Sequence, residues 1–299
     1  MYSYTEKILH IDAGTRKTHV QHIDDDFLKK YIGGVSLAAR LAYDNTPKGA
    51  DPLGPENALC FAASVFAGTM VPVGTKHAVA AKSPLTGCLG DCLASSYFSA
   101  AIKRAGYDGI VITGKAEAPT WIFVDDDAVY FNDASDLWGL ETFATEEAIR
   151  AKMGDQRVRA CTIGPGGENL VRFANLTNDR GRQAGRTGMG AVMGSKLIKA
   201  LAIRGSQPVK MADIEKLCEA ARALGEIAQT TKTEKYRTLG TPANVLAMNR
   251  LGILPTRNFQ EGEFEGAERI SGEYMHEHFT EKAVACAVCL IYRLQLLLN

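Results

Sequence analysis

The chain has 299 residues, of which 46% are hydrophobic and 23% are charged, a composition that suits a folded protein of one or two domains with a sizeable core. Its 34 Lys and Arg residues balance 34 Asp and Glu residues, so no overall field would draw the protein onto nucleic acid or an anionic membrane. Any binding of anions must therefore be local.

The two ends of the chain and its cysteines bear on its cellular location. The first residues, MYSYTEKILHID, lack the basic segment followed by an apolar stretch that marks a secretory signal. The final apolar stretch, 290–299, is much shorter than the about 20 residues of a membrane span. Seven scattered cysteines argue against a disulfide framework. We therefore expect a cytoplasmic protein without membrane or nucleic-acid partners. Cys60 is expected to be a small buried residue.

Up to about residue 205 the chain reads as short strand candidates separated by Gly, Pro and Asp. The first two, 8–12 and 18–23, flank the segment AGTRK and predict a hairpin. The next segment, 24–44, has apolar residues at helical spacing behind three aspartates that suit a helix N-terminus. It predicts one amphipathic helix, weakened by Gly33 and Gly34.

The later strand candidates show no regular alternation with helices. The segments are 58–64, 77–83, 109–115, 120–124, 128–132, 159–164 and 171–177. The acidic turn 125–127 should join two of them, 120–124 and 128–132, into a hairpin. A doubly wound parallel sheet would instead alternate strands with helices of about 10 to 15 residues. We therefore predict a mixed α+β fold.

From residue 211 onward the pattern becomes helical. In the segment 211–229, apolar residues recur on one helical face at Ile214, Leu217, Ala221, Leu224 and Ile227. A second helix is predicted over 242–252, where Gly252 and then Pro255 would end it. This change of character places a domain boundary near residues 205–210.

The segment NDRGRQAGRTGMGAVMGSK, residues 178–196, combines five glycines with three arginines and Lys196. Glycines let a ligand approach the backbone closely, while amide and guanidinium groups bind phosphate, especially if a helix starts at about Met189. The structural alternative is that Gly190 and Gly194, four apart, allow close helix packing. The segment matches neither the Walker pattern nor a dinucleotide fingerprint directly after a strand. We interpret it as an anion-binding loop.

Two other segments carry groups suited to chemistry. In GTKHAVAAKSPLTGCLGDCLASSYF, Lys76 precedes another glycine-rich turn, and Cys88 and Cys92 are interpreted as small core residues because a four-residue spacing is not a common ligand signature. Near the end, Cys286 and Cys289 form a C-x-x-C pair, which suits thiol redox chemistry, half of a zinc site or the start of an iron-sulfur site. Every metal alternative needs further thiolates, so metal binding and a structural role both stay open.

Several stretches together resemble one family, the tungsten-containing aldehyde:ferredoxin oxidoreductases. They occur in the family's order and are DPLGPENALCFA, AKSPLTG, AGYDGIVITGKAEAP, NDRGRQAGRTGMGAVMGSK, GTPANVLAMNRLGILPTRNFQ and KAVACAVC. The resemblance implies an N-terminal domain over 1–208, in which two sheets form a saddle under a tungsten bis-pterin cofactor (tungstopterin). It also implies that 209–299 begins a mostly helical domain that ligates an iron-sulfur cluster.

The resemblance also implies roles for individual residues. By position, the cofactor-binding residues of the loop would be Arg182, Gln183, Gly185 and Arg186. The backbone carbonyl of Gln183 would face a Mg²⁺ ion that bridges the pterin phosphates. Lys76 occupies the place of an arginine that bridges the pterin and the cluster, and lysine keeps the charge but loses the bidentate fork.

Other positions depart from the family pattern. Leu93 stands where an asparagine would help hold the Mg²⁺ ion. The family's [4Fe-4S] cluster is held by C-x-x-C-x-x-x-C and a distant fourth cysteine. Cys286 and Cys289 match the first two ligands, whereas Arg293 stands where the third would be. The later pterin-binding motifs and the acid-base residues of the family would lie outside this sequence.

The full activity implied by the resemblance is oxidation of a small aldehyde to a carboxylic acid in an anaerobic setting. Two electrons would pass from tungsten through the [4Fe-4S] cluster to ferredoxin or another electron-carrier protein. A benzoyl-CoA-reductase-like catalytic subunit of the same family is one alternative, and a non-catalytic truncated product is another. We expect no turnover by these 299 residues alone. A homodimer is compatible with the resemblance.

Overall fold

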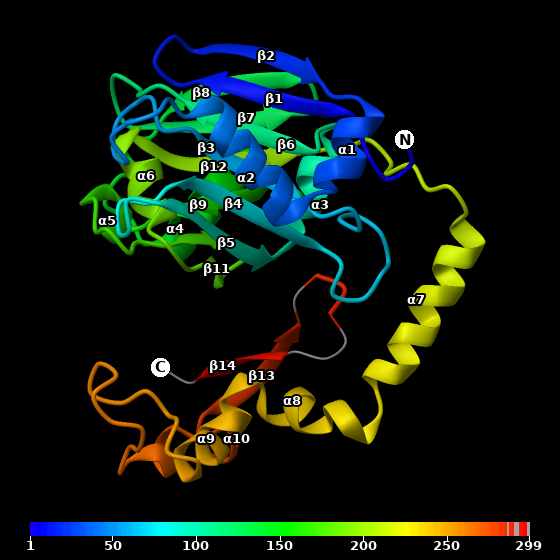
Figure 1. The fold of residues 1–299 in the computed structure, drawn as a ribbon, viewed down its shortest axis with the longest axis vertical. Coiled ribbons are helices and arrows are strands. Elements are labelled where there is room, and N and C mark those ends of the chain that lie inside the picture. Colours follow the sequence, from blue (N-terminus) through cyan, green and yellow to red (C-terminus); the bar gives the residue numbers. More distant parts are fainter. Residues whose placement is uncertain (286, 290–292, 298–299) are drawn as a thin grey trace. The chain divides into compact units, whose positions relative to one another are not determined.

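The computed structural model describes residues 1–285, 287–289 and 293–297 (Figure 1). They form two compact units, one of Met1–Thr69 and Gly74–Ile214 and the other of Met70–Val73 and Glu215–Asn299. The larger unit contains two six-stranded sheets with helices, and the smaller unit is mainly helical. The predicted α+β class with two sheets is therefore confirmed. No helix in the described ranges is long and apolar enough to cross a membrane.

The first sheet has the strand order β2-β1-β6-β3-β4-β5. Its strands are β1 (Lys7–Asp12), β2 (Lys17–His22), β3 (Leu59–Ala63), β4 (Lys76–Lys82), β5 (Leu89–Ser95) and β6 (Gly109–Thr113). β1 and β2 form the predicted hairpin, β1 and β6 are parallel, and the other neighbours are antiparallel. Within this sheet, β5 is the strand that the sequence pattern did not predict.

The second sheet has the order β11-β10-β9-β12-β7-β8. Its strands are β7 (Thr120–Asp125), β8 (Ala128–Asp133), β9 (Arg159–Thr162), β10 (Leu176–Asn178), β11 (Arg182–Ala184) and β12 (Ile198–Arg204). The predicted hairpin of β7 and β8 is confirmed, and β12 pairs with β7 in parallel. The strand predicted over 171–177 is wrong for most of its length, because only its last two residues belong to β10.

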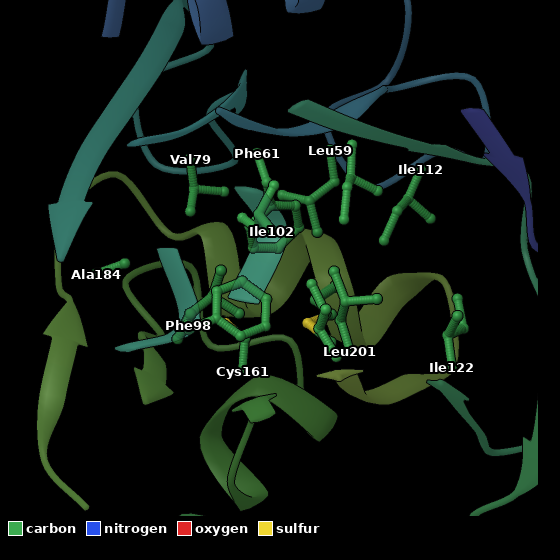
Figure 2. Close-up of a cluster of buried hydrophobic side chains, with 14 of the residues drawn as sticks. Leu59, Phe61, Val79, Phe98, Ile102, Ile112, Ile122, Cys161, Ala184 and Leu201 are labelled. Atoms are coloured by element: carbon green, nitrogen blue, oxygen red, sulfur yellow. The ribbon is translucent and has the colours of Figure 1, made fainter. Parts of the chain in front are cut away.

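The two sheets enclose the main hydrophobic core. Figure 2 shows Leu59, Phe61 and Val79 of the first sheet facing Cys161 and Leu201 of the second. The helices α3 (Tyr97–Arg104) and α6 (Met189–Ser195) supply further residues to this layer. The outer face of the first sheet packs on α2 (Gly34–Asn45), and that of the second packs on α4 (Thr142–Met153). The prediction that Cys60 is buried is confirmed.

The single helix predicted over 24–44 is two helices, α1 (Asp25–Tyr31) and α2. Asp24 caps α1 as its aspartate pattern predicts, because its carboxylate accepts a hydrogen bond from Phe27 N at 2.8 Å. Ile32 then adopts a φ of 54°, which breaks the helical hydrogen-bond pattern before Gly33. The apolar spacing continued across this break, so periodicity alone could not locate it.

Buried lysines tie several loops to the core. The Lys196 ammonium donates to Pro55 O at 2.9 Å and to Gly114 O at 3.3 Å, and burial lowers its pKa to about 8. The prediction that Lys196 supplies charge to the anion-binding loop is therefore wrong. Lys199 is likewise buried, with its ammonium bonded to Leu140 O at 2.7 Å and paired with Glu168.

The smaller unit consists of short helices and one two-stranded sheet. Its elements are α7 (Ile214–Ala228), α8 (Glu234–Leu239), α9 (Val245–Arg250), α10 (Gly272–His278), β13 (Thr280–Ala285) and β14 (Arg293–Leu297), with short 3₁₀ turns between some of them. The helix predicted over 211–229 is confirmed as α7. The one predicted over 242–252 is present as a 3₁₀ turn followed by α9. On α7, Ala221 is buried, whereas Leu224 and Ile227 of the predicted apolar face are exposed.

Candidate cofactor-binding site

The anion-binding loop predicted from the sequence begins as a tight hairpin between β10 and β11. Thr177 pairs with Gln183, and Asn178 pairs with Arg182, so the turn consists of residues 179–181. Asp179 and Arg180 have φ values of 43° and 52°, and Gly181 has a φ of 114°. Glycine adopts such values without penalty, but arginine rarely does, so surrounding contacts must support this turn.

The residues after the turn present their polar groups outward. Gln183, Gly185 and Arg186 are exposed, Arg182 is half-buried, and Ala184 points into the core. Gly185 is exposed, and a Cβ atom built on it would make ordinary contacts, 3.6 Å from Gln183 Cβ and 3.7 Å from Asn175 Nδ2. Gln183 Oε1 accepts a hydrogen bond from Thr177 Oγ1 at 2.9 Å. The loop therefore offers an exposed glycine between Arg182 and Arg186.

The loop is held against β5, the edge strand of the other sheet. Thr187 O accepts a hydrogen bond from Ser83 Oγ at 2.7 Å, and Thr187 Oγ1 donates to Asp91 O at 3.3 Å. A Cβ atom at Gly90 would lie 2.7 Å from the Cβ of Thr187, so glycine permits this close approach. The two glycine-rich segments singled out separately in the sequence thus meet in the structure.

The helix α6 begins at Met189 as predicted, but it does not provide the expected amide cradle. All seven of its residues are buried. The amide of Gly190 already donates to Ala174 O at 2.9 Å, and a Cβ at Gly194 would lie 2.0 Å from Gly167 O. Gly190 and Gly194 therefore serve close packing, and any anion site is confined to the residues before α6.

Lys76 begins β4 next to the last residue of β5. It pairs with Ser95, and the amide of Tyr97, two residues further on, donates to Asp179 Oδ2 at 2.6 Å. Lys76 and the turn 179–181 therefore both flank the end of β5. No carboxylate in the described part of the chain lies within 4.0 Å of the Lys76 ammonium or the Arg186 guanidinium.

These features fit a phosphate-bearing cofactor better than they fit a bound cation. The Arg186 guanidinium, which has no carboxylate partner in the described residues, adjoins the exposed glycine Gly185, an arrangement suited to phosphate oxygens. Leu93, which the resemblance puts where a Mg²⁺ ligand would stand, is 48% exposed on β5 and has no side-chain oxygen. Its neighbour on the same face, Asp91, is exposed and carries a carboxylate that sequence reasoning did not consider.

Two carboxylates beneath the turn were also missed. Glu146 of α4 is fully buried, accepts bonds from Arg180 N at 3.3 Å, and pairs with Arg150 at 3.1 Å. Burial raises the pKa of Glu146 to about 7, against the opposing pull of Arg150. Burial also raises the pKa of Asp179, opposed first by the hydrogen bond from the Tyr97 amide. In the sequence, Glu146 and Arg150 look like an ordinary surface pair at helical spacing.

The cysteines differ in burial. Cys92 is buried as predicted, its pKa is raised to about 12 by burial, and the Arg186 amide is hydrogen-bonded to its sulfur. Cys88 is exposed, so its interpretation as a core residue is wrong. Cys286 lies outside the described residues, and Cys289 is buried. Within the described ranges, no three His, Cys, Asp or Glu side chains are grouped to hold a metal ion.

Comparison with known proteins places both units in one family. Residues 8–205 match the family described as aldehyde ferredoxin oxidoreductase, N-terminal domain. Residues 217–292 match its counterpart, aldehyde ferredoxin oxidoreductase, domains 2 and 3. Among solved structures, the active-site complex BamBC of benzoyl coenzyme A reductase matches with a TM-score of 0.82 and 26% identity, over 96% of this chain and 46% of that chain.

Curated relatives agree with this assignment. The tungsten-containing aldehyde ferredoxin oxidoreductases of Pyrococcus furiosus and Thermococcus kodakarensis are each 38% identical over 97% of this chain and 48% of their own length. An aliphatic sulfonate oxidoreductase, WOR-like subunit, of Pyrococcus furiosus is 34% identical over 91% of this chain and 45% of its own. The chain thus spans about half the length of the curated relatives it matches. It belongs to the aldehyde ferredoxin oxidoreductase family.

Proposed function

We propose that residues 1–208 bind the pterin phosphates of a tungstopterin cofactor at the loop formed by Arg182, Gln183, Gly185 and Arg186. The observation that carries this proposal is the exposed backbone at Gly185 beside the exposed Arg186 guanidinium, which has no carboxylate partner in the described part of the chain. Guanidinium groups bind phosphate through paired, charge-assisted hydrogen bonds. When bound, the tungsten centre would supply the redox chemistry, and the chain would hold and orient it.

Other residues would complete the binding surface. Lys76, at the start of β4, would add one positive charge beside the cofactor and act as a single-point donor, because an ammonium has no bidentate fork. The Gln183 backbone carbonyl would face a Mg²⁺ ion between the phosphates, as its side-chain oxygen is already bonded to Thr177. Leu93 adds no ligand there. We therefore expect Mg²⁺ to depend on oxygens of the cofactor more than on this chain.

We further propose that residues 209–299 begin a domain that ligates a [4Fe-4S] cluster through Cys286 and Cys289. The whole protein would then oxidise a small aldehyde to a carboxylic acid in the anaerobic cytoplasm and pass the electrons to ferredoxin or a similar carrier. These 299 residues include two of the cluster's four cysteines and would give no turnover alone.

A benzoyl-CoA-reductase-like catalytic role is the second candidate. The similarity to BamBC, with a TM-score of 0.82, favours it together with the changes at Lys76 and Leu93. The two candidates share the cofactor surface and differ in substrate. Electron transfer between viologen and either an aldehyde or an aromatic acyl-CoA thioester, measured with the whole protein, would separate them.

Cofactor analysis of the purified chain tests the proposal. We expect the 299-residue protein, produced anaerobically with tungstate in a host that makes tungstopterin, to retain tungsten and pterin in a constant ratio. Metal analysis would measure tungsten, and the fluorescence of the oxidised pterin would measure the organic part. Brown colour would indicate an iron-sulfur cluster, whereas zinc at the cysteine pair would be colourless. A folded, soluble chain that carries neither tungsten nor pterin would refute the proposal.

A further inference from the structure

The turn 179–181 is supported by a buried carboxylate from a distant part of the chain. Glu146 lies 34 residues before Arg180 in sequence, yet both of its carboxylate oxygens are 3.3 Å from the Arg180 amide. Glu146 is fully buried, and its partner on α4, Arg150, holds it at 3.1 Å. A buried charged acceptor makes a stronger bond to an amide than a neutral acceptor does. This contact stabilises a residue that would otherwise avoid a φ of 52°.

A second anchor reaches the turn from the end of β5. Asp179 Oδ2 accepts a hydrogen bond from Tyr97 N at 2.6 Å, and Arg159 of β9 lies 3.8 Å from Oδ1. The Arg159 guanidinium also lies over the Tyr97 ring, 5.0 Å from its centroid. The charge of Arg182 acts on the same carboxylate and opposes the rise in its pKa. The geometry of the turn is therefore coupled to the position of Arg182.

We propose that Glu146 is a positioning residue for the cofactor loop: its buried carboxylate fixes the turn 179–181 and thereby places Arg182 at the cofactor. The inference rests on the proposed function, because it assigns a purpose to the placement of Arg182. Glu146 touches no reacting atom, and it acts through Arg180 and Asp179. Deleting its charge should loosen the turn while the two sheets stay intact.

The neighbouring residue Glu147 provides a matched control. Glu147 lies on the same helix and pairs with the side chain of the same arginine, Arg180, but its own side chain is 56% exposed. Exposed pairs contribute little to stability, so Glu147→Gln should leave the turn unchanged. Glu146→Gln keeps the size of the side chain and removes its charge. Glu146 is buried and holds the backbone amide of Arg180, whereas Glu147 is exposed and pairs with the Arg180 side chain.

Hydrogen exchange of the Arg180 amide is the direct readout, and it needs no cofactor. We expect this amide to exchange about tenfold faster in Glu146→Gln than in the parent, while Glu147→Gln matches the parent. Because the pKa of Glu146 is about 7, the parent's protection factor should fall as pH is lowered through that value. The titratable and charged groups that face Glu146 are Arg150 on α4, Asp179 and Arg180 in the turn, and the Cys161 thiol on β9, which burial keeps neutral.

Pterin content of the same proteins connects the turn to the cofactor. Glu146→Gln should retain less pterin than Glu147→Gln although Arg182 is present in both. An Arg180 amide that exchanges at the parent rate in Glu146→Gln would overturn the inference, whatever the pterin content. Absence of pterin from the parent would instead refute the proposed function and leave the exchange comparison valid. If Glu146→Gln does not fold, the parent's pH profile decides, and a protection factor that stays constant through the pKa of Glu146 would overturn the inference.

Discussion

Replacement of Asp108 by alanine is expected to lower the free energy of unfolding of the larger unit by about 3 to 5 kcal/mol. Asp108 forms a fully buried pair with Lys103, and its second oxygen accepts from the amides of Thr5 and Glu6 at 3.0 and 2.8 Å. The substitution leaves the Lys103 ammonium with Ser3 O, at 2.8 Å, as its remaining hydrogen-bond partner in the described residues. Burial already lowers the pKa of Lys103, and Asp108 opposes that shift.

Urea unfolding followed by tryptophan fluorescence would measure this loss, because both tryptophans belong to the larger unit. The double variant Lys103→Met with Asp108→Ala should recover part of it, since it also removes the unpaired charge. Asp44→Ala is the control: Asp44 is exposed, its partner Arg40 is only half-buried, and the expected cost is below about 1 kcal/mol. A cost for Asp108→Ala as small as that of Asp44→Ala would contradict the burial of the pair.

Gly194→Ala is expected to cost about 3 kcal/mol, the upper part of the range for overpacking a core. The added Cβ would lie 2.0 Å from the backbone oxygen of Gly167, which belongs to α5 (Pro165–Glu168). Two backbone segments would have to separate, because neither contact atom is part of a flexible side chain. The change tests the packing role that α6 has in place of the predicted amide cradle.

Gly166→Ala is the matched control, since it places the same methyl group on α5 with nothing within 4 Å. It should be neutral or slightly stabilising, because alanine favours a helix more than glycine does. The measurement is the difference in urea midpoint between the two variants. Equal midpoints would show that α6 does not pack closely on α5.

Local patterns carried enough information for the hairpins and for several isolated elements. The turn between β7 and β8 contains three consecutive acidic residues between alternating apolar segments, and the aspartates before α1 cap it at Asp24. Such signals depend on neighbours within a few residues. The α+β class followed from the spacing of these segments.

The features that the sequence did not reveal depend on contacts between distant segments. β5 was not predicted because its seven residues include a glycine, an aspartate and a cysteine in place of a regular apolar alternation, and it is defined by pairing with β4. Lys196 falls in the glycine-arginine segment and lysine is usually exposed, whereas here its buried ammonium donates to the carbonyls of Pro55 and Gly114.

The candidate site was predictable only where its signal lies in neighbouring residues. Glycines and arginines concentrated in one segment indicated an anion-binding loop, and the resemblance named Arg182 and Gln183 within it. The supports of that loop, Glu146 and Tyr97, are separated from it by more than 30 residues, and their burial has no local signature. Local patterns therefore indicated the loop that is proposed to face the ligand, but not the distant residues that hold it.

The tungsten content of Arg182→Ala, measured beside the parent chain and Arg16→Ala, tests the central claim most directly. Arg16 is an exposed arginine in the turn between β1 and β2, so its loss controls for a change of one positive charge. We expect Arg16→Ala to match the parent and Arg182→Ala to retain about a tenth of the tungsten or less, as loss of a charge-assisted pair would give. Equal tungsten in all three folded proteins would contradict the assignment of this loop to the cofactor.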